Sequence, residues 1–303
     1  MLRCSAIIVT HNSAEAIGEC IEALAPEGCE IVVVDNDSRD ATVQRVEEFV
    51  AWHEVRLLAN RDNLGFAAAA NQGARAATGD VLLVLNPDAI AEPGSVKELL
   101  LCMEASHWSA AGGALLKSDG SPARGFAFRR LPTLATLLCE SVLVNQLWPG
   151  NSVNRRYRCL DADYSQQQEV EQPAGACLAI TRDAWNQTGG FDQQFYPLWF
   201  EDVDLCKRLL DRRCKIVYCP AARFRHSGAH SVSQLSFREK QVFWYTNMLR
   251  YARKHFSRGQ ITGLRAGIVA GMLLRSFAAL LGARQGPLGE TLAAYWEVMR
   301  KVR

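Results

Sequence analysis

The stretch VLLVLNPDAIAEPG, residues 81–94, joins a strongly apolar run to a single acid. Five apolar residues lead directly into Asn86-Pro87-Asp88, and a proline and a glycine then close the segment before the next helical pattern. A short apolar run that ends in turn residues is typical of a strand covered on both faces, as in a parallel sheet. We therefore predict that Asp88 stands at the carboxyl end of a buried strand.

Similar apolar runs recur along the chain. Helical patterns with one apolar face separate the first four runs, which predicts βαβ units and a mostly parallel sheet flanked by helices, an α/β fold. The runs span residues 5–10, 31–35, 55–58 and 81–85, with later ordered segments at 110–116, 174–181 and 215–219. One helix is predicted over 66–77, and another is predicted to begin near residue 201.

The composition is that of a folded protein. The chain has 303 residues, 49% of them hydrophobic and 22% charged, which suits one enlarged α/β domain or one domain with appendages. Its ten cysteines include no C-x-x-C pair, which argues against a zinc site or redox motif and indicates mostly buried thiols. Because no signal-peptide pattern precedes the first run, we expect a protein of the reducing cytoplasm.

The C-terminal part of the chain is basic. The segment from Arg250 onward has ten lysines and arginines but two glutamates, so it carries +8 and the rest of the chain carries −6. Such a tail suggests contact with an anionic surface, either lipid headgroups or nucleic acid. Residues 264–281 are apolar but include Arg265 and Arg275, which predicts an amphipathic interfacial helix and not a membrane span. The alternative is a helix packed on the rest of the protein.

Polar residues follow each of the first four strands. They are Thr10-His11-Asn12, Asp35-Asn36-Asp37, Asn60 with Asn63-Leu64-Gly65-Phe66, and Asn86-Pro87-Asp88. Each residue alone could cap a helix or form a turn, but in a parallel sheet the carboxyl ends of the strands meet at one edge, where ligands bind. The glycine fingerprint of dinucleotide-binding folds and the Walker loop are both absent, which excludes most oxidoreductases and nucleotide triphosphatases.

In several stretches the chain resembles the family-two glycosyltransferases with the GT-A fold, in their rhamnosyltransferase-like branch. The matching stretches are SAIIVTHNS, EIVVVDNDSRDAT, NRDNLGFAAAANQGARAATGDVLLVLNPDA, PAGACLAITRDAWNQTGGFDQQFYPLWFEDVDLCKRL and RHSGAHS. The resemblance implies a catalytic domain over 1–232, in which 117–170 form an irregular insertion on the acceptor side. Residues 233–303 would form a helical, basic extension.

The resemblance further implies a bound nucleotide-sugar donor. Thr10 and Asn12 would line the base and ribose, and Asn36 would meet the pyrimidine edge. Many family members have aspartate at the position of Asn36, but an amide oxygen can also accept the N3–H of uracil or thymine. Gly65 would let the backbone approach the nucleotide. The remaining residues assigned to the nucleotide-sugar site are Asp35, Asn63, Phe66, Asn86 and Asp88.

A divalent cation, Mg²⁺ or Mn²⁺, is implied as the partner of the donor's diphosphate. Asp88 corresponds to the last residue of the family's short acidic motif, which contacts the metal, while Asn86 and Pro87 replace the earlier acids. One carboxylate is sufficient, since Mg²⁺ takes one or two protein carboxylates together with phosphate and water. We expect His226 as a second metal ligand, although a lone histidine is often a packed or surface residue.

The pair Glu201-Asp202 falls at the start of a predicted helix. Acids are favoured in any first helical turn, but the family's glutamate-aspartate motif supplies the general base that deprotonates the acceptor hydroxyl. We assign that role to Asp202, with Glu201 as the second choice. Trp199 and Phe200 could form an acceptor platform or belong to the core. Asp204 and Arg208, four residues apart, are expected to pair only with each other.

The sequence thus predicts a metal-dependent inverting glycosyltransferase of cell-surface polysaccharide or lipopolysaccharide assembly. Branch resemblance implies dTDP-rhamnose as donor and a glycan or lipid-linked acceptor; no nucleic-acid partner is expected. The alternatives are a UDP-hexose or UDP-N-acetylhexosamine transferase of the same fold, and a non-catalytic protein that binds a surface or nucleic acid. A sugar-nucleotide-forming nucleotidyltransferase lacks its arginine-bearing glycine loop here. The expected location is cytoplasmic, with peripheral binding at the inner face of the cell membrane.

Overall fold

The computed structural model describes residues 2–50, 55–105, 107–228, 230–284 and 286–302. Among these residues, a nine-stranded sheet runs in the order β3-β2-β1-β4-β10-β6-β11-β5, with β8 paired to β11. Its strands are β1 (Cys4–Thr10), β2 (Glu30–Asn36), β3 (Val55–Asn60), β4 (Val81–Leu85), β5 (Ala89–Ala91), β6 (Ala110–Leu116), β8 (Gln168–Glu169), β10 (Cys177–Thr181) and β11 (Ile216–His226). A two-stranded sheet pairs β7 (Phe128–Arg129) with β9 (Gln172–Pro173).

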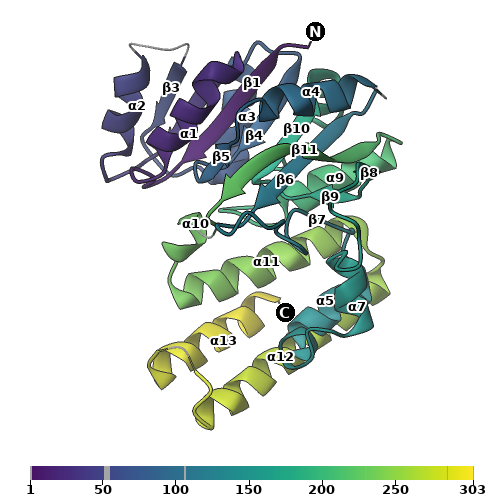
Figure 1. Ribbon diagram of the computed structural model, residues 1–303. Helices are drawn as coiled ribbons and strands as arrows, with labels where there is room; N and C mark the ends of the chain where they lie inside the picture. The colour runs from purple at the N-terminus through teal and green to yellow at the C-terminus, as the bar shows by residue number, and fades with distance from the viewer. Residues whose placement is uncertain (1, 51–54, 106, 229, 285, 303) are drawn as a thin grey trace.

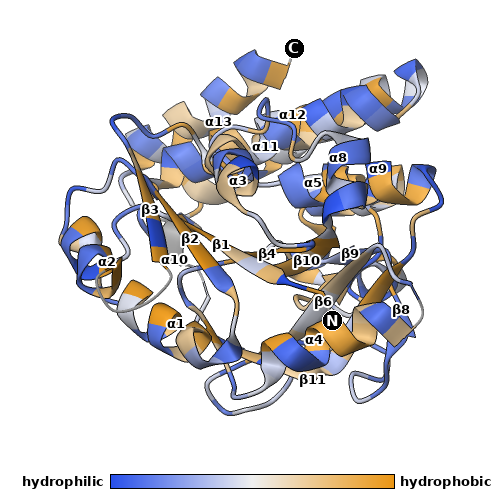
Figure 2. Ribbon diagram, turned by 90° about the horizontal axis from the view of Figure 1, so that it is seen from above, coloured by the Kyte–Doolittle hydropathy of each residue, from blue (hydrophilic) through white to orange (hydrophobic). Residues whose placement is uncertain are grey.

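Helices cover both faces of the main sheet. Figure 2 shows α1 and α4 on one side of the apolar strands and α3 and α8 on the other. These helices and their neighbours are α1 (Ile17–Leu24), the 3₁₀ turn η1 (Ala25–Glu27), α2 (Thr42–Val50), α3 (Phe66–Ala76), α4 (Ser95–Ala105), α8 (Arg182–Thr188) and α9 (Glu201–Asp211). The remaining helices are α5 (Leu134–Ser141), α6 (Val144–Leu147), α7 (Ser152–Tyr157), α10 (His230–Ser233), α11 (Phe237–His255), α12 (Arg258–Leu280) and α13 (Leu288–Val302).

The predicted α/β fold is confirmed, and the first four strands pair in parallel as expected. All five residues of β4 are buried, in keeping with a strand covered on both faces. The second half of the sheet is mixed, because β10 runs antiparallel to both β4 and β6. The apolar run of β10 resembles that of a parallel strand, so its direction could not be predicted from the pattern.

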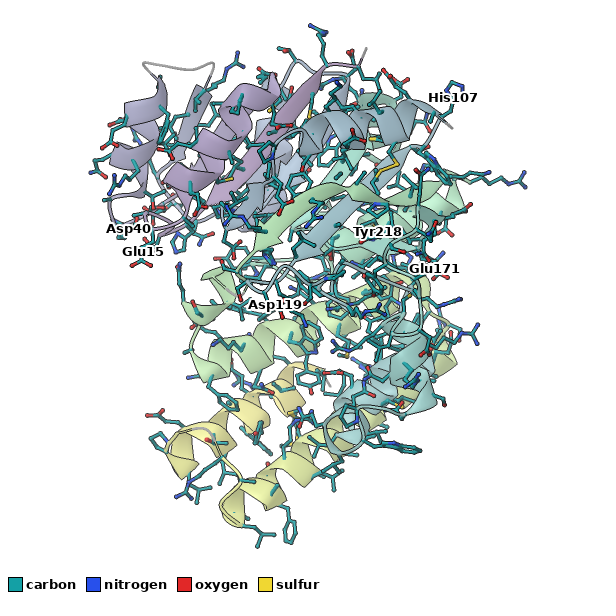
Figure 3. The ribbon with its side chains drawn as sticks, in the orientation of Figure 1. Glu15, Asp40, His107, Asp119, Glu171 and Tyr218 are labelled. Atoms are coloured by element: carbon teal, nitrogen blue, oxygen red, sulfur yellow. A yellow bond between two sulfur atoms is a disulfide. The ribbon has the colours of Figure 1, made fainter. Side chains whose placement is uncertain are left out.

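The segment 117–170, expected to be irregular, contains the three short helices α5, α6 and α7. Thr133 caps α5 and Asn151 caps α7, each by accepting a hydrogen bond from a backbone N–H of the first turn. Aromatic rings anchor the segment to the sheet. Tyr218 of β11, labelled in Figure 3, is fully buried. Its ring centroid lies 4.7 Å from that of Phe128. The segment is therefore fixed against the end of the sheet.

The C-terminal helices form a layer below the sheet, with α11 nearest to it and α12 and α13 outermost (Figure 1). Their buried side chains share one apolar cluster with Phe195, Phe200 and Val203, which flank the start of α9. Of the described helices, only α12 is long and apolar enough to cross a membrane, and a third of its most apolar window is buried.

Arg275 shows that one face of α12 packs on the protein. Its side chain is buried and donates to the carbonyl of Ser141, and to that of Glu140 at 3.2 Å. Both carbonyls belong to the last turn of α5, where a cation is favoured. On this face α12 packs on the rest of the protein, which was the alternative to an interfacial helix.

A buried carboxylate joins α9 to α11. Asp204 is fully buried and accepts from Arg208 Nε at 2.7 Å, from Lys254 Nζ at 2.9 Å and from His255 Nε2 at 2.7 Å. The expectation that Asp204 pairs only with Arg208 is therefore wrong, because two residues about 50 positions away complete the cluster. Burial acts to raise the pKa of Asp204, but the hydrogen bonds from its cationic neighbours outweigh it and lower the pKa to about 2.

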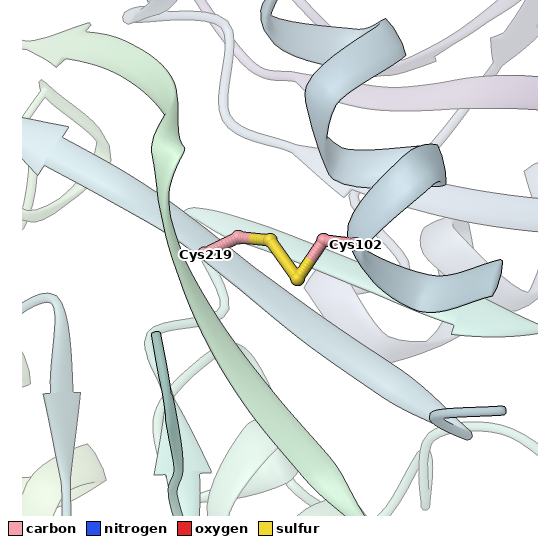
Figure 4. Close-up of a disulfide and its surroundings, with 2 residues drawn as sticks. All are labelled: Cys102 and Cys219. Carbon is pink, nitrogen blue, oxygen red and sulfur yellow. A yellow bond between two sulfur atoms is a disulfide. The ribbon is translucent and has the colours of Figure 1, made fainter. Parts of the chain in front are cut away.

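Two cysteines form a disulfide that the sequence did not predict. Cys102 of α4 and Cys219 of β11 are bonded, 117 residues apart in the chain (Figure 4). The other eight cysteines are free, and five of them are buried, as expected of thiols in the core. The spacing of cysteines carries no information about pairs that only the folded chain brings together.

Replacing Asp204 should destabilise the protein strongly. Asp204→Asn leaves Arg208, Lys254 and His255 without their shared buried carboxylate, so we expect the free energy of unfolding at pH 7 to fall by about 3 kcal/mol. Because the folded-state pKa is depressed, Asp204 contributes about 2 kcal/mol that is present above pH 4 and lost as pH falls toward 2. Urea denaturation across this pH range measures both effects.

The matched control is Asp211→Asn on the same helix. Asp211 pairs with Lys207 at the surface, with half of its side chain exposed, and should contribute less than about 1 kcal/mol. Equal losses in the two variants would contradict a structural role specific to Asp204.

Candidate active site

A cavity of about 650 Å³ opens at the carboxyl ends of β1, β2 and β4. The insertion containing α5 to α7 and the helix α11 complete its walls. Eleven residues assigned to the site from sequence line it: Thr10, Asn12, Asn36, Asn63, Phe66, Asn86, Trp199, Phe200, Glu201, Asp202 and His226. Asp35, Gly65 and Asp88 stand behind this wall and contact residues within it.

Asp35 supports the strand ends at the nucleotide side of the cavity. Its carboxylate is buried and accepts from Thr10 Oγ1 at 3.0 Å and from the Ser38 N–H at 3.0 Å. Asn12 has a positive φ of 50°, and its amide oxygen accepts from the Arg39 N–H at 2.7 Å. These bonds hold the loops after β1 and β2 together, so Asp35 orders the wall without lining it.

Asn36 is held by the loop that follows β3. Its amide oxygen accepts from the Leu64 N–H at 3.0 Å and from Asn60 Nδ2 at 3.3 Å. Its amide nitrogen donates to Asn63 Oδ1 at 2.9 Å. Both ends of the amide already have partners in the loop, so base recognition here would involve Asn63 and the loop backbone along with Asn36.

Gly65 has a structural reason to be glycine. Its φ is 81°, and a Cβ atom would lie 2.7 Å from Cδ2 of the Tyr196 ring. The next N–H, of Phe66, donates to the Pro197 carbonyl at 2.8 Å. The sequence prediction invoked the approach of a nucleotide, whereas the close neighbour in the structure is the loop that leads into α9. A side chain here would displace that loop.

Asp88 and His226 face each other at the end of β11. Asp88 Oδ1 lies 3.4 Å from His226 Nε2, and both side chains are almost completely buried. His226 Nε2 makes no hydrogen bond with any described residue, and the Phe126 ring stacks on the imidazole at 5.3 Å.

This carboxylate and imidazole fit two ligands of a divalent cation whose other ligands are phosphate and water oxygens. A cage of three or more His, Cys, Asp or Glu side chains is absent from the described residues. The side chains of His230 and Ser231, in the same motif, lie outside the described structure. Arg223 and Arg225 form surface ion pairs with Glu92 and Glu19.

Asp202 projects into the cavity from the first turn of α9. Its Oδ2 accepts from the Gly175 N–H and from Gln172 Nε2, both at 3.0 Å, and its Oδ1 accepts from the Val203 N–H. Burial raises the pKa of Asp202, and the backbone hydrogen bonds oppose this rise. A fixed carboxylate with a raised pKa is suited to accept a proton near neutral pH.

Glu201 differs from its neighbour in its surroundings. It is buried, and its Oε2 has no hydrogen-bond partner among the described residues. Burial, and then the charge of Asp202, raise the pKa of Glu201 well above its ordinary value. The carboxylate of Asp202 is oriented by hydrogen bonds from Gln172 and the Gly175 N–H, whereas Glu201 Oε2 has no partner among the described residues, which favours Asp202 as the base.

The two aromatic residues of the expected acceptor platform differ in exposure. Phe200 is 5% exposed and packs on Trp244 and Tyr251 of α11, so most of its surface belongs to the core. Trp199 is half-buried, and its ring lies edge-on to that of Trp244 at 5.6 Å. Both carry a positive φ, which turns the chain sharply before α9.

Several cavity residues were not identified from the sequence. The insertion contributes Phe126, Arg129, Tyr157 and Arg158, and α11 contributes Phe243 and Trp244. Gln172 and Gly175 were also missed, although they hold the carboxylate of Asp202. None stands at a predicted strand end, which was the signal used. The glycine in PAGAC was a usable clue, because a Cβ there would lie 3.2 Å from Cβ of Asp202.

Comparisons with known proteins show similarity to glycosyltransferases. Residues 5–157 match the model of glycosyl transferase family 2, and residues 155–230 match the model described as N-terminal domain of galactosyltransferase. The chain is 34% identical over 218 residues to N-acetylglucosaminyl-diphospho-decaprenol L-rhamnosyltransferase of Mycobacterium tuberculosis, covering 67% of this chain and 68% of the relative. It is 23% identical to rhamnosyltransferase WbbL of Escherichia coli, covering 82% of this chain and 92% of the relative.

Two solved structures share the fold. GalNAc-T7, in a crystal structure with UDP, GalNAc and Mn²⁺, aligns with a TM-score of 0.63 at 14% identity over 100% of this chain and 56% of its own. Staphylococcus aureus TarS, in complex with UDP-GlcNAc, aligns with a TM-score of 0.58 at 16% identity over 99% of this chain and 82% of its own. At these identities the likeness shows the fold alone.

The Asp88–His226 pair should bind a divalent cation together with a nucleoside diphosphate. We expect Mn²⁺ to increase the rise in melting temperature caused by dTDP or UDP, since a ligand bound only by the folded state stabilises it. Asp88→Asn and His226→Ala should lose this Mn²⁺-dependent part and keep the part caused by nucleotide alone. Thermal-shift measurements with and without Mn²⁺ test this.

Asp80→Asn is the control, because Asp80 flanks β4 at its opposite end and is solvent-exposed. A Mn²⁺-dependent shift that survives in Asp88→Asn would exclude Asp88 as a ligand.

Proposed function

The chain belongs to the family 2 glycosyltransferases, and we propose that it transfers L-rhamnose from dTDP-rhamnose to a hydroxyl of a lipid-linked or glycan acceptor. The 34% identity to a rhamnosyltransferase, over two thirds of both chains, supports this donor sugar. That relative is named for a diphosphate-linked decaprenol, which supports a lipid-linked acceptor and a role in cell-surface polysaccharide assembly. The observation that carries the proposal is one cavity lined by the buried carboxylate of Asp202 and by His226, with Asp88 directly behind His226.

In this proposal the donor's nucleotide lies over the ends of β1, β2 and β3. Thr10, Asn12 and Asn36 would face the nucleoside, with Asn63 and Phe66 beside it. Asn86 and Asp88 would face the diphosphate. A divalent cation held by Asp88 and His226 would neutralise the charge that the nucleoside diphosphate gains as it leaves. The sugar would then lie between this end of the cavity and Asp202.

Asp202 would act on the acceptor. The acceptor oxygen attacks the anomeric carbon while the bond from that carbon to the diphosphate oxygen breaks, and the bonding electrons leave with the nucleoside diphosphate. The proton of the acceptor hydroxyl passes to the carboxylate of Asp202. A single displacement of this kind inverts the anomeric configuration. Gln172 and the Gly175 N–H keep the carboxylate in place for this step.

We also propose that the protein binds the inner face of the cell membrane as a peripheral protein. The outer faces of α12 and α13 expose an apolar patch: Leu273, Leu274, Phe277, Leu280, Leu281 and Trp296, each about half exposed or more. Arg284, Arg300 and Lys301 lie in or beside the same elements and are exposed. Apolar side chains next to cations suit an anionic lipid surface, from which a lipid-linked acceptor would be taken.

Replacement of the base should abolish turnover and spare donor binding. For Asp202→Asn we expect kcat to fall by about 10²–10⁴-fold with dTDP-rhamnose, while nucleotide affinity stays the same. Because the pKa of Asp202 is raised, wild-type kcat should fall on acidification at a pH above the ordinary aspartate range. Steady-state assays with radiolabelled donor measure these quantities.

Glu201→Gln is the matched control, since the amide has the same shape as the carboxyl group and burial raises the pKa of Glu201. It should retain most of the turnover. Full activity of Asp202→Asn would contradict the proposed mechanism, and efficient transfer from UDP-hexoses but not dTDP-rhamnose would contradict the donor.

The apolar patch can be tested by point substitution, whereas removing the whole tail would also remove α11 from the core. Phe277→Glu together with Leu281→Glu should reduce binding to phosphatidylglycerol-phosphatidylethanolamine vesicles by more than about tenfold, because charges oppose insertion. Vesicle sedimentation measures this. Leu101→Glu, at an exposed apolar residue on α4, is the control. Unchanged vesicle binding would contradict membrane docking. So would substitutions that disrupt a dimer of the protein and leave vesicle binding intact.

A further inference from the structure

Two arginines of the insertion line the same cavity as Asp202. Arg129 is the last residue of β7, and Arg158 directly follows α7. Both are half-buried cavity residues. The mechanism above uses neither of them, and neither stands at a strand end.

The backbone around Gly125 brings the two arginines together. Arg129 Nε donates to the Gly125 carbonyl at 2.9 Å. Arg158 packs on the other side of the same residue, where a Cβ on Gly125 would lie 3.2 Å from Cβ of Arg158. The Gly125 N–H donates to the hydroxyl of Tyr164 at 2.9 Å, which fixes this turn. Arg158 Nε donates to the side chain of buried Asn154 at 3.1 Å.

Aromatic rings position Arg129 relative to the cation pair. Its guanidinium lies 5.7 Å from the ring centroid of Phe126 and 5.8 Å from that of Tyr157. Phe126 in turn stacks on His226. Arg129 is therefore one aromatic ring away from the end of the cavity where Asp88 and His226 meet.

The charge of these arginines is not neutralised by an ion pair with any residue that the structure describes. Their terminal guanidinium nitrogens also make no hydrogen bond within the described chain. By contrast, the neighbouring Arg130 and Arg155 pair with Glu171 and Asp161. Burial, and then the charge of Arg129, lower the pKa of Arg158, as expected for two cations held close together.

Glu140 is an acid on the cavity wall whose charge raises the pKa of Arg158. This effect is smaller than the lowering caused by the charge of Arg129. The carboxylate of Glu140 accepts from Asn145 Nδ2 at 3.0 Å. Holding two guanidinium groups together in a cavity costs free energy unless an anion occupies the space between them. Two planar forks suit the oxygens of a diphosphate.

We propose that Arg129 and Arg158 bind the diphosphate of a polyprenyl-diphosphate-linked sugar, so that the acceptor is recognised by its anionic linkage as well as by its sugar. This inference rests on the proposed function and names its acceptor class. The donor's diphosphate is assigned to Asp88 and His226, on the far side of the Phe126 ring. The charge of Arg129 also acts on Asp202, which places the pair beside the group that receives the acceptor's proton.

A comparison of charged and neutral acceptors tests this directly. Arg129→Gln and Arg158→Gln should each raise KM for prenyl-diphosphate-linked N-acetylglucosamine by about tenfold or more, through loss of a charge-assisted bidentate contact. KM for dTDP-rhamnose and for an alkyl N-acetylglucosaminide, which has no phosphate, should not change. Arg156→Gln, at an exposed arginine two residues before Arg158, is the control for both folding and net charge. Arg158→Lys should recover part of the loss.

A binding arm separates this inference from the proposed reaction. With the enzyme saturated with dTDP and Mn²⁺, farnesyl diphosphate should bind to wild type and to Arg156→Gln, and about tenfold or more weakly to Arg129→Gln and Arg158→Gln. Such binding without any sugar transfer would contradict the proposed function but support the diphosphate site. A raised donor KM in the arginine variants with acceptor KM unchanged would assign the pair to the donor and overturn the proposal. Equal binding by all variants would overturn it too.

Discussion

The buried ion cluster at Asp204 is the constraint on which the rest of the site depends. One carboxylate of α9 is shared by Arg208 of the same helix and by Lys254 and His255 of α11. Asn247 of α11 also donates to the carbonyls of Tyr196 and Leu198, so the helix holds the loop that enters α9. The first turn of α9, with Glu201 and Asp202, is thereby fixed relative to the sheet. The C-terminal helix α11 therefore packs against the segment that carries Glu201 and Asp202.

The cavity divides its charges between two ends. The Asp88–His226 pair lies at one end, and the carboxylate of Asp202 is held by Gln172 and the Gly175 N–H at the other. Between them stand the Phe126 ring and the guanidinium of Arg129. Burial, and then the charge of Asp202, raise the pKa of Glu201, so the two adjacent acids differ in their surroundings. Donor charge and acceptor charge can therefore be met by different groups.

Much of this was predictable from local patterns. The apolar runs gave the strands to within a few residues, and the Asn and Asp residues that end them identified the wall formed by β1, β2 and β4. Contacts between distant segments were not predictable. The partners of Asp204 lie about 50 residues away, Arg129 and Arg158 stand in a stretch without periodicity, and the close neighbour of Gly65 is Tyr196. Such pairings depend on tertiary packing, which leaves no trace in spacing.

In the proposed mechanism, a single displacement at the anomeric carbon moves a sugar from a nucleotide to an acceptor hydroxyl. The most direct test is the anomeric configuration of the product, determined by NMR from the one-bond C1–H1 coupling after reaction with dTDP-rhamnose and a prenyl-diphosphate-linked sugar. We expect a glycoside whose anomeric configuration is opposite to that of the donor. A product that retains the donor's configuration would contradict the assignment of Asp202 as the base of a single displacement.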